Sequence, residues 1–405
     1  MKRLFKNAKV FDGCGQVIAS GWMLVDGDKI AGVGPMDRIP ETESGLEITD
    51  LSGQTLLPGL IDGHVHICLE GSPDPLKTAG EQNEVQLSLL TAGHAARTLA
   101  AGFTTVRDLG GPNFVNIAVR NAIRSGHIPG PRIICAGQNI CMTGGHGWRI
   151  GREADGPDEI RRAVREQAKA GADLVKFMAT GGVLTEVGKP GQVQLTGEEL
   201  KTGIDEAHRA GLKTSTHAKG LEGIKNAVRA GIDTIEHGDM LDDEVIEQII
   251  EKGIYVVPTL TAGANIIAEG TEGGVPEWAV EKARRTRPER LEILRKAKSA
   301  GINIGYGTDA GTPFNYHGKN AAEFIHLINE VGFSPLEVLA LATSANADML
   351  GLGHTIGRLA KGFSADFIVV KGDPASDPVV LIDLNNIKSV YQNGRKVAEG
   401  GQLIF

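Results

Sequence analysis

Eight short apolar runs, alternating with amphipathic segments, constrain the fold of this chain more than any other feature. The runs occupy residues 56–67, 104–110, 131–138, 173–182, 213–218, 234–238, 255–260 and 303–310. Between most of them lies a segment whose apolar residues recur at helical spacing, as in 158–172, 196–212 and 242–253. This alternation predicts an α/β protein, a (β/α)8 TIM barrel whose parallel strands are buried on both faces. An open doubly wound sheet is the alternative fold, but no GxGxxG motif opens a helix after the first run.

The two ends of the chain carry a different pattern. Stretches 4–12, 22–34, 46–53, 365–373 and 387–401 alternate apolar and polar residues between turn signals, and Asn393-Gly394 is a two-residue hairpin signal. Neither end offers enough strands to bury a face alone, so we expect both ends to pair in one small β-sandwich domain. The predicted domains are a discontinuous sandwich, 1–57 with 358–405, and a barrel, 58–357.

The charge balance argues against nucleic acid and membrane as partners. The formal net charge is −8, and no dense Lys/Arg tract provides a local basic field. No stretch approaches the roughly 18 apolar residues of a membrane span, and the N-terminal residues lack the apolar core of a signal peptide. Four cysteines without a CxxC pair favour reduced thiols. We expect a cytoplasmic protein that acts on a small molecule, and we expect a homo-oligomer.

His64 and His66 are the first residues that indicate chemistry. They alternate with Val65 on a predicted strand, so both imidazoles point to one side. Two neutral imidazoles on one face can chelate a metal ion. The alternative is a pair of surface histidines, but the apolar residues on either side indicate a buried strand, where unpaired imidazoles are costly.

Three further candidate ligands end predicted strands. His217 and His237 end the fifth and sixth runs, and Asp309 ends the eighth. Each alone could be a turn or helix-capping residue. In a barrel, however, the carboxyl ends of the strands share one mouth, so these residues converge there. Imidazole nitrogens with carboxylate oxygens suit zinc, manganese or iron better than calcium.

Lys176 lies in the middle of the fourth run, among apolar residues. Burial disfavours the charged ammonium and lowers the pKa of such a lysine. A neutral amine can react with carbon dioxide to give a carbamate, an anionic ligand able to bridge two cations. The alternative is a lysine that extends to the barrel rim or pairs with a buried acid.

These residues together resemble the amidohydrolase superfamily, over nearly the whole chain. The segments AGFTTVRDLGG, TGGHG, VKFMATGG, IEHG and GTDAG are similar to the branch that contains imidazolonepropionase, prolidase-like dipeptidases and ochratoxin-type amide hydrolases. The resemblance implies that His64, His66 and Asp309 hold one divalent ion, with zinc the first expectation. It implies that His217 and His237 hold a second ion and that carboxylated Lys176 bridges the two.

The resemblance also implies a mechanism. A hydroxide shared by two ions attacks an amide carbonyl. Asp309 takes the proton of the hydroxide and delivers it to the leaving amine. His146, in TGGHG, matches a histidine that stabilises the oxyanion, although a Gly-rich loop can also use a histidine to cap a turn.

The sequence leaves several classes of amide as possible substrates. A dipeptide or an N-acyl amino acid is favoured, because Lys219 follows the STHA motif and can bind a carboxylate. Prolidase-like relatives typically have a tyrosine there, which leaves Xaa-Pro specificity open. Arg149, Arg152 and His317 are further candidates for substrate contacts. A non-peptide amide of the ochratoxin, aryl amide or urea type is an alternative.

Two other functions stay open with less support. Imidazolonepropionase lacks the bridging lysine, so Lys176 argues against that activity. A metal-free scaffold of the same fold is the alternative from another class, although all six ligand positions are filled here. We also expect long loops, including 71–84 and 261–300, to cover the open face of the barrel as partial lids.

Overall fold

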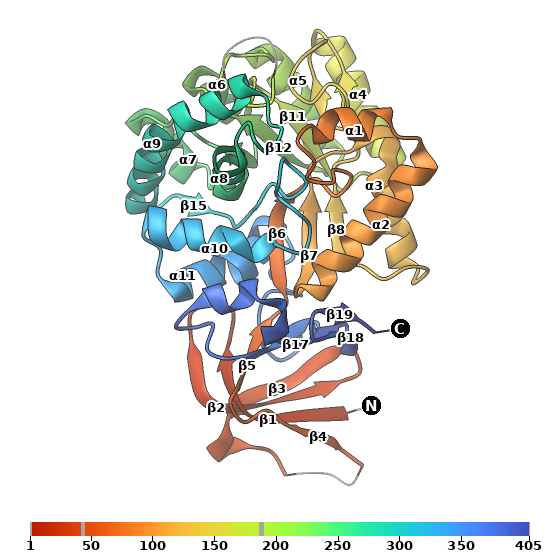
Figure 1. Cartoon of the computed structure of the whole chain (residues 1–405), viewed down its shortest axis with the longest axis vertical. Helices are drawn as coiled ribbons and strands as arrows, with labels where there is room; N and C mark the ends of the chain where they lie inside the picture. Colours follow the sequence, from red (N-terminus) through yellow and green to blue (C-terminus); the bar gives the residue numbers. More distant parts are fainter. Residues whose placement is uncertain (1, 42–44, 186–189, 405) are drawn as a thin grey trace.

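Parallel strands alternating with helices build the larger part of the molecule (Figure 1). The computed structural model describes residues 2–41, 45–185 and 190–404. One parallel sheet of seven strands has the order β10-β9-β11-β12-β13-β14-β15, and a second of three strands has the order β6-β7-β8. The bounds are β6 (Leu60–Val65), β7 (Phe103–Asp108), β8 (Arg132–Cys135), β9 (Ile140–Cys141), β10 (Arg152–Glu153), β11 (Leu174–Met178), β12 (Lys213–Ala218), β13 (Thr234–His237), β14 (Tyr255–Val257) and β15 (Asn303–Ile304). Each of the eight predicted runs overlaps one of these strands.

Backbone hydrogen bonds join the two parallel sheets at β6 and at β8. Beside β6, the Gly63 N–H donates to the Tyr306 carbonyl and the Asp309 N–H donates to the His64 carbonyl, each at 2.8 Å. Beside β8, the Asp173 N–H donates to the Cys135 carbonyl at 2.8 Å. The predicted strand and helix alternation is confirmed, whereas closure into one eight-stranded barrel stays a prediction.

Helices follow most of these strands. They are α1 (Pro75–Glu81), α2 (Glu84–Ala100), α3 (Val115–Arg124), α4 (Pro157–Ala170), α5 (Gly197–Arg209), α6 (Leu221–Ala230), α7 (Asp243–Glu251), α8 (Leu260–Glu269), α9 (Glu277–Ala300), α10 (Glu323–His326), α11 (Pro335–Ala340) and α12 (Asn346–Met349). Local sequence explains their limits, as in α5, where Thr196 and Glu199 form a capping box. α4 ends at Gly171, whose φ of 85° suits a residue without a side chain.

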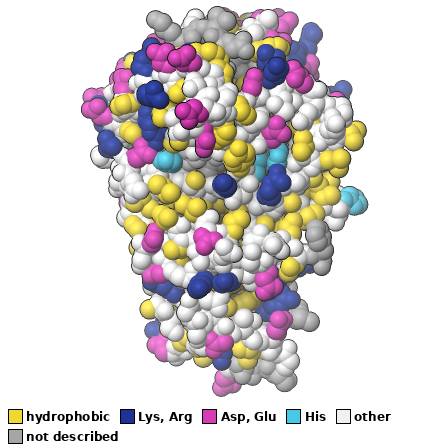
Figure 2. Space-filling model, in the orientation of Figure 1, with side chains coloured by type: hydrophobic (Ala, Val, Ile, Leu, Met, Phe, Trp, Pro, Cys, Tyr) yellow, Lys and Arg dark blue, Asp and Glu magenta, His cyan; other side chains and the backbone are white. Residues whose placement is uncertain are grey.

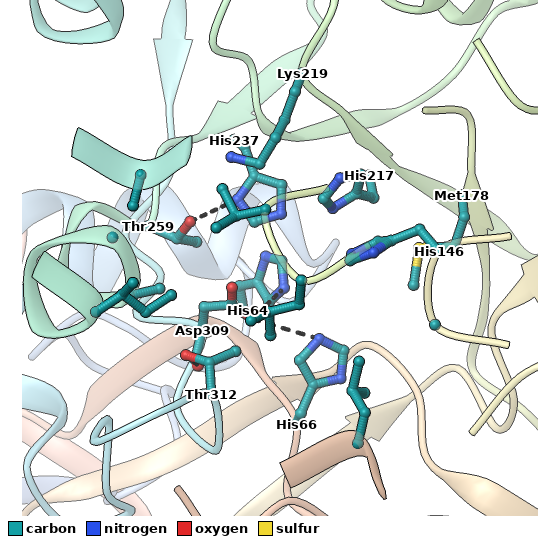
Figure 3. Close-up of a pocket in the computed structure, with 18 of the residues that line it drawn as sticks. His64, His66, His146, Met178, His217, Lys219, His237, Thr259, Asp309 and Thr312 are labelled. Carbon is teal, nitrogen blue, oxygen red and sulfur yellow. Dashed lines mark hydrogen bonds and ion pairs between the residues drawn. The ribbon is translucent and has the colours of Figure 1, made fainter. Parts of the chain in front are cut away.

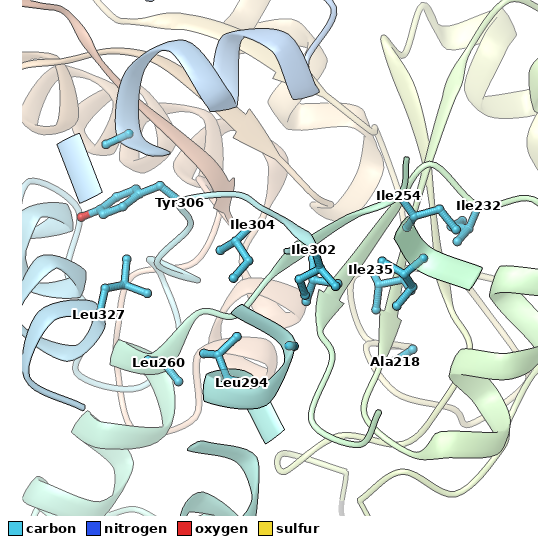
Figure 4. Packing of buried hydrophobic residues seen from close by; sticks show 14 of the residues in the cluster. Ala218, Ile232, Ile235, Ile254, Leu260, Leu294, Ile302, Ile304, Tyr306 and Leu327 are labelled. Carbon is cyan, nitrogen blue, oxygen red and sulfur yellow. The ribbon is translucent and has the colours of Figure 1, made fainter. Parts of the chain in front are cut away.

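Aliphatic side chains fill the space between the strands and the helices around them (Figure 4). Ile235 on β13 and Ile304 on β15 belong to the same buried cluster as Leu294 on α9. Because strands in this layer are covered on both faces, a polar side chain within them needs a specific partner. This requirement makes the few charged residues of the strands informative.

Strands from both ends of the chain form one mixed sheet of nine strands, below the helices in Figure 1. Its strands are β1 (Lys2–Phe11), β2 (Val17–Asp26), β3 (Lys29–Pro35), β4 (Glu47–Asp50), β5 (Gln54–Pro58), β16 (Phe367–Lys371), β17 (Ile387–Gln392), β18 (Arg395–Glu399) and β19 (Gln402–Leu403). Asn393 and Gly394, with φ of 50° and 71°, connect β17 to β18, so the predicted hairpin is confirmed. The pairing of the two ends is observed, whereas a two-layered sandwich and the boundaries 1–57, 58–357 and 358–405 stay predictions.

Charged side chains of both signs are interspersed on the face shown in Figure 2. Among the described residues, no helix combines the length and the apolar character that crossing a bilayer requires.

Candidate metal centre

All six predicted metal ligands line one pocket (Figure 3). They come from β6, β11, β12, β13 and the segments that follow β6 and β15. The polar lining of the pocket includes His64, His66, His146, Lys176, His217, Lys219, His237, Thr259, Arg287, Arg290, Asp309 and Thr312. Residues up to 245 positions apart in the sequence thus meet at one end of the parallel strands, as expected for strand ends that share a mouth.

His64, His66 and Asp309 form the tightest group of potential ligands. Their ligand atoms all lie within 4.8 Å of one another. His66 Nδ1 donates to the Gly110 carbonyl at 3.1 Å, which leaves its Nε2 with a lone pair facing Asp309 Oδ1 at 3.4 Å. His64 Nε2 lies 3.2 Å from the same oxygen. Electron-pair donors that face one another in a buried site fit a cation bound among them.

Glu236 orients His64, and the sequence analysis missed it. Its Oε2 accepts from His64 Nδ1 at 2.8 Å, and its Oε1 accepts from Arg107 at 2.8 Å. Glu236 is fully buried; burial alone would raise the pKa of its carboxyl, but Arg107, Lys176 and His64 outweigh burial and hold that pKa well below its usual value. An ionised Glu236 fixes the proton on His64 Nδ1 and leaves Nε2 free to bind a metal ion.

His217 and His237 lie beside this group. The ring centroid of His237 lies 5.3 Å from that of His64 and 4.5 Å from that of His217. His237 Nδ1 lies 2.7 Å from Thr259 Oγ1. His217 Nε2 is buried without a hydrogen-bond partner among the residues that the structure describes. Such a nitrogen is costly unless a ligand satisfies it.

The backbone is strained at two of the candidate ligands. His237 has a φ of 72° and Asp309 a φ of 62°, which side chains other than glycine rarely adopt. Thr259, the partner of His237, has a φ of 50°. Strain of this kind gathers at functional sites, where it aims side chains that regular strands would turn elsewhere.

Lys176 is the most unusual residue of the pocket. Its side chain is fully buried, and its Nζ has no hydrogen-bond partner within the described parts of the chain. Burial lowers the pKa of Lys176 to about 7, an effect that the charge of Glu236 opposes and that of Arg107 reinforces. The side chain is therefore available as a neutral amine close to neutral pH. The predicted alternative, a lysine paired with a buried acid, lacks a direct partner here.

His146 and Lys219 occupy the walls of the pocket. The His146 ring centroid is 4.2 Å from that of His217, and burial together with Lys219 lowers the pKa of His146 to about 3, so its ring is neutral. Lys219 Nζ donates to Asp239 Oδ2 at 2.8 Å, and Arg290 Nε lies 2.7 Å from Asp239 Oδ1. This cluster of three buried charges has a formal net charge of +1.

The other three candidates for substrate contacts do not line the metal pocket. Arg149 lines a second pocket next to the first. Arg152, on β10, forms an ion pair with Glu166 at 2.8 Å. His317 is stacked on His94 with ring centroids 4.7 Å apart, and its Nε2 donates to the carbonyl oxygens of His66 and Leu69. That position favours support of the loop after β6 rather than contact with a substrate.

The two segments expected to form lids do contribute to the pocket, as helices rather than loops. Leu76 on α1 lines it, and so do Ala262 and Ile266 on α8. Ala283, Thr286, Arg287 and Arg290 on α9 line it as well. The helices thus add both apolar side chains and the charged Arg287 and Arg290 to the polar residues at the strand ends.

Comparisons with known proteins identify the family of this chain. Residues 55–397 match the amidohydrolase family. Ochratoxinase from Aspergillus niger is 31% identical over 421 aligned positions, which cover 95% of this chain and 84% of that protein. The solved structure of a Xaa-Pro dipeptidase with bound methionine in its active site is 34% identical with a TM-score of 0.89, covering 98% of this chain and 99% of that one. Imidazolonepropionase from Geobacillus is 22% identical over 96% of this chain and 92% of that protein. The chain belongs to the amidohydrolase family and is a hydrolytic enzyme that acts on carbon–nitrogen bonds.

Proposed function

We propose that this enzyme hydrolyses the amide bond of a dipeptide or an N-acyl amino acid at a centre of two divalent metal ions. The observation that carries this proposal is the convergence of six donor side chains, of which Lys176 and His217 have buried nitrogens without hydrogen-bond partners among the described residues. Zinc is the expected metal, with manganese and iron as alternatives, because the donors combine imidazole nitrogens and carboxylate oxygens.

The six side chains divide between the two ions. His64, His66 and Asp309 form one compact set, and His217 with His237 forms the other. Lys176 on β11 would hold both ions after carboxylation. In that reaction the neutral amine adds to carbon dioxide and releases one proton to solvent, and the product is an anionic carbamate. The absence of a hydrogen bond at Lys176 Nζ, among the described residues, supports this role.

The side chains around the centre have distinct tasks. Bound metal ions polarise the amide carbonyl and lower the pKa of the attacking water. Asp309 accepts a proton from that water and delivers it to the leaving nitrogen. The Gly182 N–H donates to Thr185 Oγ1 at 2.9 Å, so the Thr185 hydroxyl can donate to His146 Nδ1, 2.9 Å away. That arrangement leaves the His146 proton on Nε2, where it can stabilise the oxygen of the carbonyl under attack.

The substrate carboxylate binds near Lys219. The Lys219, Asp239 and Arg290 cluster keeps one net positive charge next to the metal ligands, in a region that excludes water. A buried positive charge attracts a carboxylate more strongly than an exposed one, because the local dielectric is low. Free dipeptides and N-acyl amino acids carry such a carboxylate.

A second candidate is a non-peptide amide of the ochratoxin, aryl amide or urea type. Val183, Leu184 and Ile266 favour it, because these apolar side chains of the lining offer a bulky substrate group a surface for packing. The complete set of donor side chains argues against a metal-free scaffold. Lys176 still argues against the activity of imidazolonepropionase.

The architecture is part of the same proposal. We propose that residues 58–357 form a closed (β/α)8 barrel and that 1–57 and 358–405 form a β-sandwich domain. Hydrogen bonds beside β6 and β8 support closure. The homo-oligomeric state and the cytoplasmic location stay predictions from the sequence.

The direct test is a screen of dipeptides and N-acyl amino acids with zinc-loaded protein in bicarbonate buffer. We expect hydrolysis of several members, and loss of all of it in Asp309→Asn. The matched control is Asp233→Asn, which changes an aspartate beside β12 and β13 that lies outside the pocket lining. Hydrolysis that survives in Asp309→Asn, or none by the wild type, would contradict the proposal.

A further inference from the structure

A second pocket adjoins the metal centre and is lined by two tryptophans. Six of its residues form what we call the vestibule: Pro73, Leu76, Trp148, Leu184, Pro276 and Trp278. Leu76, His146, Gly147 and Leu184 line both pockets, so the vestibule continues directly from the metal centre. His146, at the junction, is the residue proposed to contact the amide carbonyl.

Two of the three tryptophans of the chain line this pocket, although aromatic residues are rare in the sequence. The whole sequence contains three tryptophans, and only 4% of its residues are aromatic. The third, Trp22, lies in the terminal sheet against Gly32 and Gly34. Trp148 is 44% exposed, so a large part of this residue remains open to a ligand. An exposed tryptophan beside an active site is a surface on which a planar ring can stack.

The charged side chains around the vestibule limit which kind of ligand it can bind. The Arg149 guanidinium lies 4.7 Å from the centroid of the Trp148 ring, and Lys282 Nζ lies 4.7 Å from that of Trp278. Lys282 also donates to the Thr185 carbonyl at 2.8 Å, which fixes the cation in place. Two cations on the indole rings, against the carboxylate of Asp74 in the same lining, disfavour a positively charged ligand.

The orientation of a bound substrate can be inferred from the residues that line each pocket. Lys219 and Arg290 line the metal pocket but not the vestibule, as far as the described residues show. A substrate whose carboxylate lies near Lys219 and whose carbonyl lies at His146 directs its acyl half toward the vestibule. We propose that the vestibule is a subsite for a planar aromatic group on the acyl half of the substrate, with Trp148 as the stacking residue. This inference rests on the proposed hydrolysis of an N-acyl amino acid.

Binding can be tested without turnover, by titrating the zinc-loaded enzyme with benzoate and following tryptophan fluorescence. Acetate is the matched control, because it carries the same carboxylate without the ring. We expect benzoate to change the fluorescence at saturation and acetate not to do so. The Kd for benzoate, measured by calorimetry, should rise about tenfold in Trp148→Ala and less in Trp148→Phe, because phenylalanine keeps a stacking face. Trp22→Phe should keep the wild-type Kd.

A kinetic comparison tests the same subsite. The ratio of kcat/KM for N-benzoylglycine over N-acetylglycine should fall about tenfold in Trp148→Ala. An unchanged ratio, or a benzoate Kd that Trp148→Ala leaves unchanged, would overturn the subsite. If the wild type cleaves neither compound, the screen of dipeptides and other N-acyl amino acids still decides the proposed function, and the benzoate titration decides whether the vestibule binds aromatic rings.

Discussion

Two lysines on neighbouring strands of the pocket have similar burial and opposite surroundings. Lys176, on β11, is fully buried and has no hydrogen-bond partner among the residues described. Lys219, just after β12, is 7% exposed and donates to Asp239. Burial lowers the pKa of both amines, but Asp239 opposes the effect at Lys219, whereas no acid among the described residues forms a hydrogen bond with Lys176.

The difference shows that burial alone does not assign a role to a lysine. At Lys219 a carboxylate partner keeps the charged ammonium favourable, so this residue serves as a fixed cation. At Lys176 burial lowers the pKa to about 7, so a neutral amine is present near neutral pH and can be carboxylated to an anionic ligand. We therefore expect substitutions of the two lysines to affect different measurements.

The largest effect is expected for Lys176→Ala. Without the bridging anion, the repulsion between two cations is no longer offset, so metal content and kcat should fall together, kcat by at least about 100-fold. Formate or acetate should restore part of both, because a small carboxylate can supply the missing oxygens. Metal analysis and steady-state kinetics measure the two quantities on the same sample.

Lys176→Arg is the matched control for charge and size. A guanidinium stays protonated and cannot be carboxylated, so this variant should also lose metal and activity. A Lys176→Ala protein that keeps two metal ions and normal turnover would show that the bridge is not needed.

A smaller effect is expected for Glu236→Gln, which changes the support of a ligand rather than a ligand. A neutral amide holds His64 Nδ1 less firmly and leaves Arg107 without its ionic partner. Metal affinity should fall about 10-fold to 100-fold, and the Tm of the metal-free protein should also fall. Glu244→Gln, on the exposed part of α7, is the control. Equal metal affinity and equal Tm in both variants would show that Glu236 does not support His64 as a ligand.

The smallest effect on the chemical step is expected for Lys219→Ala. A carboxylate clamp acts in the ground state and in the transition state alike, so KM should rise about 10-fold to 100-fold while kcat stays near normal. The effect should disappear for a substrate whose carboxylate is replaced by an amide. Lys225→Ala, which removes a lysine paired with Asp242 and Glu244, should leave KM unchanged. An unchanged KM in Lys219→Ala would eliminate the clamp.

The strands and the convergence of the six candidate ligands in one pocket could be predicted from the sequence because their signals are local. His64 and His66 follow the period of a strand, and Lys176 interrupts an apolar run. The convergence of His217, His237 and Asp309 needed only the rule that parallel strand ends share one mouth.

The partners of these residues could not be predicted in the same way. Glu236 and Arg107 also interrupt apolar runs, so each could have been noticed as a buried charge. Their pairing, however, depends on which strands face each other across the interior, and local spacing does not specify that. The same holds for Lys219 with Asp239, whose contact depends on the loops after β12 and β13. The position of His317 behind the loop after β6 likewise depends on tertiary packing.

The most direct test of the binuclear centre is the metal content of the purified wild-type enzyme, prepared with zinc and bicarbonate. Six converging donors with a bridging lysine predict close to two divalent ions per chain, and fewer when carbon dioxide is removed during preparation. One ion or none, with no increase after added zinc or manganese, would contradict the binuclear centre.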